Sequence, residues 1–231
     1  METPLTFARG LRDGAPFLLV IVPFGLLFGV VGTEAGLDPA QVMGLSVVVI
    51  AGAAQFTAVQ LLQDGAPAAV IVLSALAVNL RMAVYSASLV PHLGPAPLWQ
   101  RVLAAYALTD QSFAVGSVAF AASPSRPWEE KMRYYAGACA TVVPLWYLST
   151  LAGVLAGGAI PPAVPLDFAV PITFLAIVAP MLRTRAHVVA AITAVIVALA
   201  LHGLPWNGGL FAASLAAMLA GAETERRTAR A

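Results

Sequence analysis

The sequence predicts an all-α membrane protein, a polytopic bundle of about seven or eight transmembrane helices, several of them kinked or broken by proline. Composition is the first reason, because 60% of the residues are hydrophobic and only 10% are charged, whereas soluble domains carry about 25% charged residues. The second reason is the pattern. Apolar stretches of roughly 20 residues, each long enough to cross a bilayer, alternate with short turns rich in Gly, Pro or charged residues.

The expected elements follow in order along the chain. Residues 1–14 form a polar N-terminal lead-in, residues 15–222 the transmembrane domain, and residues 223–231 a basic tail. Eight spans are expected within the transmembrane domain, at residues 15–32, 42–62, 66–90, 98–122, 134–155, 166–182, 186–201 and 208–222. Because the last of these is only about 15 residues long, a seven-span arrangement stays open.

Prolines interrupt the first and fifth spans, at Pro23 and Pro144. Proline removes a backbone donor, so we expect a helix break at each position, with a harmless kink as the alternative. Both spans also follow a basic segment, which is a weak sign of two four-helix halves. Interrupted helices at matching places in two halves point to a transport site.

Basic residues are distributed unevenly between the two sides of the expected bundle. With eight spans, ten of the twelve Lys and Arg residues fall on the side of both termini, whereas Arg101 falls on the other side and Arg81 within the membrane. Cytoplasmic loops carry the excess of Lys and Arg. Both termini are therefore expected in the cytoplasm.

Seven deep polar residues stand out on three consecutive spans: Gln55, Asn79, Arg81, Tyr85, Thr109, Asp110 and Gln111. Ionisable residues inside a membrane face the bundle interior, pair with one another and mark substrate or ion pathways. Arg81 and Asp110 are the natural pair, either as a structural salt bridge or as part of a site. Arg81 and Tyr85 are four residues apart and share a helix face, whereas Asn79 falls on the other side.

These residue types suit an amino acid or an organic acid as substrate. The guanidinium group of Arg81 matches a carboxylate, and Asp110 could bind an ammonium group or carry a coupling proton. We expect substrate contacts from Gln55, Asn79, Arg81, Tyr85 and Thr109, although buried amides such as Gln55 also join helices to one another.

Other function classes find no support in the sequence. No basic patch is interleaved with aromatic residues, so no nucleic-acid partner is expected. The three histidines share no metal-ligand spacing with one another or with Cys139, so we expect no metal and no cofactor. The motifs of intramembrane proteolysis and prenyl transfer are missing from the sequence, so no enzyme activity is expected.

Several of these segments together resemble the AzlC family, whose members are large subunits of branched-chain amino acid exporters. The resemblance rests on residues 14–17, 23–25, 51–56 (AGAAQF), 79–81 (NLR), 85–86, 108–113 (LTDQSF) and 166–168. It implies a permease of the bacterial inner membrane that works with a small AzlD-type membrane subunit. Such a permease would move leucine, isoleucine, valine or related amino acids outward using the proton gradient.

One position departs from the family pattern. Family members often have glutamate where this chain has Gln111, which leaves Asp110 as the expected proton carrier. The alternative reading is an accessory or scaffolding subunit, whose deep polar residues only assemble partner helices in the lipid bilayer.

Overall fold

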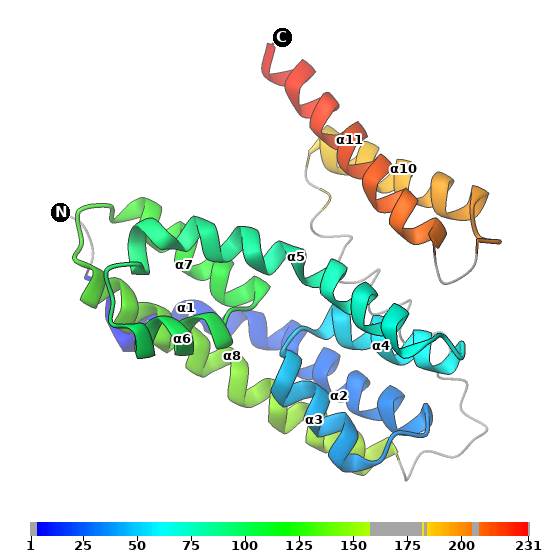
Figure 1. Cartoon of the computed structure of the whole chain (residues 1–231). Helices are drawn as coiled ribbons and strands as arrows, with labels where there is room; N and C mark the ends of the chain where they lie inside the picture. The colour runs from blue at the N-terminus through cyan, green and yellow to red at the C-terminus, as the bar shows by residue number, and fades with distance from the viewer. Residues whose placement is uncertain (1–3, 158–181, 183, 205–207, 231) are drawn as a thin grey trace. The chain divides into compact units, whose positions relative to one another are not determined.

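The computed structural model describes residues 4–157, 182, 184–204 and 208–230 (Figure 1). Every regular element in these ranges is a helix, which confirms the predicted all-α fold class. The chain divides into two compact units, Met1–Pro165 and Leu166–Ala231. The expected sixth span and the motif at residues 166–168 lie outside the described residues, apart from Leu182.

Three helices in the described residues are long and apolar enough to cross a membrane: Phe7–Glu34, Ala68–Leu93 and Trp128–Gly157. The first is built from α1 (Phe7–Gly14), a single 3-10 turn η1 (Ala15–Phe17) and α2 (Leu18–Glu34). The second is α5 and the third is α8. The lead-in expected at residues 1–14 is thus largely helical and forms the start of the first long helix.

The two prolines do not end the helices that contain them. Pro23 lies inside α2 and Pro144 lies inside α8, and each helix continues on both sides of its proline. The prediction of a helix break at each of these positions is therefore wrong, and the alternative of a proline within a continuous helix is correct. Among the described residues, the second and fourth expected spans are divided instead, at residues 50–51 and 107–109, where the sequence has no proline.

The first long helix packs along α8 through glycines. A Cβ added at Gly10 would meet the carbonyl of Tyr134, and one at Gly29 would meet that of Thr150. A Cβ on Gly153 of α8 would likewise meet the backbone of α2. Small residues allow this close approach in membranes. Because contact positions increase together along both helices, the first and fifth expected spans run in the same direction.

The second expected span, 42–62, does not cross as one helix. It is divided into α3 (Pro39–Val49) and α4 (Gly52–Gln63) at Ile50, whose φ of 43° and ψ of 38° lie in the left-handed region. A branched residue rarely adopts this conformation. The start of α3 and the end of α4 lie together, because Gln41 and Leu62 line one small cavity. We call this folded-back pair the first hairpin (Figure 1).

The fourth expected span, 98–122, is divided in the same way. It consists of α6 (Leu98–Tyr106) and α7 (Asp110–Ala122), with the turn at residues 107–109. Trp99 near the start of α6 and Trp128 at the start of α8 line one cavity. Just beyond α7, the carbonyl of Pro124 accepts a hydrogen bond from Lys131 of α8 at 3.0 Å. This second hairpin therefore begins and ends beside the start of α8. The prediction that residues 98–122 cross the membrane as one span is wrong.

α5 runs opposite to α8 and joins the two hairpins. It begins after α4 and ends at Leu93. In its last turn, Nδ1 of His92 lies 3.5 Å from Nζ of Lys131. A buried apolar core forms where α5, α7 and α8 meet, with Leu89, Phe120, Tyr134 and Ala138 among its members.

Because residues 98–122 fold back, Arg101 lies on the other side of the bundle from the one predicted. Because α6 starts at the same end as α1 and α8, Arg101 joins the basic residues there instead of lying opposite them. Six of the seven Lys and Arg residues in the first unit then gather at one end, and only Arg81 lies between the ends. The folded-back hairpins fit the charge rule better than the crossing spans did.

The second unit contains α10 (Arg185–Ala200) and α11 (Gly208–Arg230) in its described residues. The two helices pack against each other, with Gly221 beside Ala190. α11 does not end at residue 222, so the expected tail continues the last helix.

Candidate functional site

The turns of the two hairpins lie next to each other within the first unit. The hydroxyl of Tyr106, at the end of α6, donates a hydrogen bond to the carbonyl of Val47 in α3 at 2.8 Å. It also lies 2.7 Å from the hydroxyl of Tyr147 in α8. Broken helices that meet in this way are typical of the binding sites of transporters, because their ends present unpaired backbone groups and helix dipoles.

The ion pair between Arg81 and Asp110 lies at the turn of the second hairpin. Nη2 of Arg81, in the middle of α5, is 3.1 Å from Oδ2 of Asp110. Asp110 is the first residue of α7, where the positive end of the helix dipole favours a carboxylate. The side chains keep 35% and 41% of their surface exposed, so the pair is accessible to a ligand.

Tyr85 lies one turn beyond Arg81 on the side of α5 that faces α7. Its ring stacks on Phe113 with the centroids 4.1 Å apart and the planes 7° from parallel. Arg81 and Tyr85 thus share one helix face, as their spacing predicts. The stacked rings form an apolar wall beside the ion pair.

Thr109 caps the start of α7. Its Oγ1 accepts a hydrogen bond from the backbone N–H of Ser112 at 3.2 Å, and its own N–H donates to Oγ of Ser112 at 2.8 Å. This capping box satisfies the first turn of α7. Ser112 in turn lies 3.3 Å from the hydroxyl of Tyr135 in α8. Thr109 therefore positions Asp110 by fixing the start of its helix.

Gln55 takes part in a different network from the ion pair. It is 1% exposed, and its Nε2 donates to Oγ of Ser46 at 3.1 Å. Ser46 donates in turn to Oγ1 of Thr150 at 3.3 Å. These bonds join the two arms of the first hairpin to α8. No bond to Arg81 or Asp110 is found for Gln55 in the described part of the chain.

Several buried polar atoms near the turns lack a hydrogen-bond partner among the described residues. They include Oδ1 of Asn79, Nε of Arg81, Oε1 of Gln55 and Nε1 of Trp146. Most buried polar atoms in proteins are paired, so unpaired ones mark places where a water, an ion or a substrate supplies the missing partner. Asn79 and Arg81 are the two of these that lie on α5 beside the ion pair.

Sequence reasoning missed Ser46, Tyr106, Tyr147 and Thr150, which connect the hairpins to α8. A single hydroxyl in an apolar span usually bonds its own helix, so the sequence carries no signal for these contacts. Within the described ranges, no group of three or more His, Cys, Asp or Glu residues is placed to hold a metal ion.

Comparison with known proteins gives a family and several relatives. The model of the family described as "AzlC protein" matches residues 16–160, which include both hairpins and the ion pair. An "Uncharacterized membrane protein" of Archaeoglobus fulgidus is 31% identical over 218 residues, which cover 92% of this chain and 93% of the relative. The "Inner membrane protein YgaZ" of Escherichia coli is 25% identical over 181 residues, covering 74% of this chain and 71% of YgaZ.

A shorter match joins the chain to an "Uncharacterized membrane protein" of Helicobacter pylori, 31% identical over 113 residues, with 47% of this chain and 49% of the relative covered. No solved structure matches. Because the family model matches more than half of the 231 residues, and one relative above 30% identity is matched over nearly its whole length, the chain belongs to the AzlC family of membrane proteins.

Proposed function

We propose that the chain is the permease subunit of a proton-coupled secondary transporter that exports branched-chain or related hydrophobic amino acids across the inner membrane. The observation that carries the proposal is the ion pair between Arg81 and Asp110 at the turn of a broken helix. An amino acid is a zwitterion, so it can supply a counter-charge to both residues of such a pair at once. Its carboxylate takes Arg81 and its ammonium group takes Asp110, so neither charge is left unpaired in the membrane.

The apolar part of the substrate needs a second surface. The stacked rings of Tyr85 and Phe113 lie beside the pair and offer one. Protonation of Asp110 would break the pair without substrate, which gives a simple route for coupling to the proton gradient. The chain performs binding and movement in this mechanism and no covalent chemistry.

The proposed partner is a small AzlD-like membrane subunit, as the family resemblance implies. The end of the first unit that carries six basic residues faces the cytoplasm in this proposal. The substrate then enters from that end and leaves at the end that carries the turns after α2 and α4.

A second candidate is an accessory subunit that only assembles partner helices. The network from Gln55 through Ser46 to Thr150 favours it, because these bonds connect the first hairpin to α8 and not to the ion pair. In that case the path for the substrate would lie in the partner.

Efflux of labelled leucine tests both candidates. Cells are loaded with a leucine-containing dipeptide and compared with neither subunit, with each subunit alone and with both. We expect export only with both, and its loss in Arg81→Ala and Asp110→Asn. Asp64→Asn, in the exposed turn after α4, is the matched control and keeps export.

Two results decide against the proposal. If the assembled complex exports leucine normally with Ala at position 81 and Asn at position 110, the ion pair is not the site. If the partner alone exports, the accessory reading is correct.

A further inference from the structure

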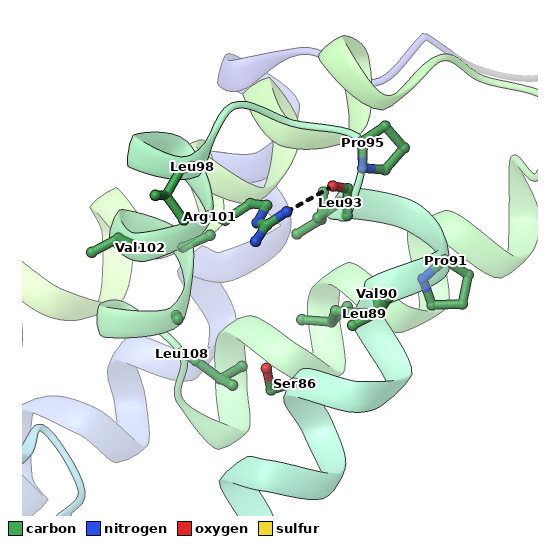
Figure 2. A pocket seen from close by; sticks show the side chains of 13 residues that line it. Ser86, Leu89, Val90, Pro91, Leu93, Pro95, Leu98, Arg101, Val102 and Leu108 are labelled. Atoms are coloured by element: carbon green, nitrogen blue, oxygen red, sulfur yellow. Dashed lines mark hydrogen bonds between the residues drawn. The ribbon is translucent and has the colours of Figure 1, made fainter.

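A groove between α5 and α6 includes neither residue of the ion pair in its lining and has no role in the proposed transport. It has a volume of about 720 Å³, within the usual range for small-molecule sites. It extends from Ser86 and Leu108, near the turn of the second hairpin, to Pro95 and Arg101 at the basic end of the first unit (Figure 2).

The walls of the groove are apolar. Leu89, Val90 and Leu93 come from α5, and Leu98 and Val102 come from α6. α6 buries none of its residues, and Leu98 is 68% exposed. A helix so incompletely covered in a membrane protein needs apolar material against it.

Arg101 supplies the one charge in this apolar lining, as far as the described residues form it. Figure 2 shows its side chain reaching from α6 toward the end of α5, where its Nη1 lies 3.4 Å from the carbonyl of Gly94. Among the described residues it has no carboxylate partner, whereas Arg9 and Arg126 at the same end pair with Asp13 and Glu130. Within the described part of the chain, its other N–H groups make no hydrogen bond and can bind an anion.

We propose that this groove binds an anionic phospholipid, with the phosphate on Arg101 and one acyl chain along α5 and α6. A guanidinium group binds phosphate through paired hydrogen bonds, and basic pockets between membrane helices hold lipid head groups. The distribution of polarity supports this occupant over a helix of a partner subunit. A cation at the membrane end and an apolar lining toward the interior match a lipid head group and its chain.

The head group can be specified further. No Asp or Glu lines the groove among the residues that the structure describes, so an ammonium-bearing head group such as phosphatidylcholine would find no counter-charge from them. Phosphatidylglycerol carries only the phosphate charge and is therefore the expected ligand.

The test uses the purified full chain in detergent, together with its partner subunit if the two copurify. Native mass spectrometry counts bound lipid, and thermal unfolding measures stabilisation by added phosphatidylglycerol against phosphatidylcholine, since a ligand stabilises the state it binds. For the unaltered chain we expect stabilisation by phosphatidylglycerol only.

Two variants test the contact with the lipid head group and the contact with the acyl chain separately. Arg101→Gln should weaken phosphatidylglycerol binding about tenfold, as expected for the loss of a charge-assisted contact. Val102→Trp keeps the charge but fills the groove, and should reduce binding to a similar degree. Arg12→Gln is the matched control, because Arg12 is an exposed arginine at the same end outside the groove, and it should bind as the unaltered chain does.

The proposal is overturned if both groove variants bind phosphatidylglycerol normally, or if Arg12→Gln weakens binding as much as they do. It is also overturned if Val102→Trp releases the partner subunit while lipid binding stays unchanged, which would assign the groove to a partner helix. None of these readouts depends on transport, so they separate this site from the proposed export function.

Discussion

Neutralising one half of the Arg81–Asp110 pair leaves the other charge alone in the membrane, and this cost distinguishes a structural bridge from a substrate site. We consider Asp110→Asn, Arg81→Gln and the double variant. If the pair is only a bridge, the double variant should restore both stability and export. If the pair also binds substrate, the double variant should restore stability alone.

The size of the effect follows from the geometry. At the N–O distance of 3.1 Å, an effective dielectric constant near 20 gives an attraction of about 5 kcal/mol. More than a third of each side chain is exposed, so solvent screening reduces the measurable coupling to about 2 kcal/mol. Each single variant should lower the melting temperature by about 4 to 8 °C.

Thermal unfolding of the three variants, followed on a size-exclusion column, gives the coupling as a double-mutant cycle. Leucine efflux is measured for the same three proteins. A coupling below about 0.5 kcal/mol would refute the ion pair within the membrane. Export by the double variant at the unaltered rate would refute the substrate role and leave the pair as a bridge.

Three further predictions address the fold. Gly29→Leu places a side chain against the backbone of α8 and should abolish folded protein on a size-exclusion column, whereas Gly44→Leu, which meets no atom within 4 Å, should not. Tyr106→Phe removes the bond to Val47 and should cost about 1 kcal/mol in thermal unfolding; no loss would mean that this contact does not hold the hairpins together. In a protein in which Cys139 has been replaced, the substitutions Pro95→Cys and Ser125→Cys should each give a thiol that reacts with an impermeant reagent from the same side of the membrane. Labelling from opposite sides would show that residues 98–122 cross it.

Much of the site could be predicted because charge in a membrane must be paired. Arg81 lies deep in an apolar run, and Asp110 is the acidic residue at a similar depth in the next run, so pairing them needed no structure. The shared face of Arg81 and Tyr85 followed from helix periodicity. Gln55 could not be placed in this way, because an amide finds a partner on any neighbouring helix, and only the packing of α3 and α8 selects Ser46 and Thr150.

The positions of the helix breaks could not be predicted. Pro23 and Pro144 lie within continuous helices, whereas the breaks occur at Ile50 and at residues 107–109, where no proline marks them. A proline can remain in a membrane helix when neighbouring groups satisfy the freed carbonyl. Conversely, packing against α2 and α8 can hold a branched residue in a left-handed conformation that its own preference opposes.

The sequence by itself determined the membrane environment, the helical fold and the charges that must meet, because each depends on composition and on the cost of an unpaired charge in lipid. Only the tertiary structure decided that residues 39–63 and 98–122 fold back instead of crossing. The physical reason is that hydropathy measures how apolar a segment is and how long it is. A pair of short helices joined by a turn has the same apolar length as one span, and the contacts with α2, α5 and α8 determine its direction.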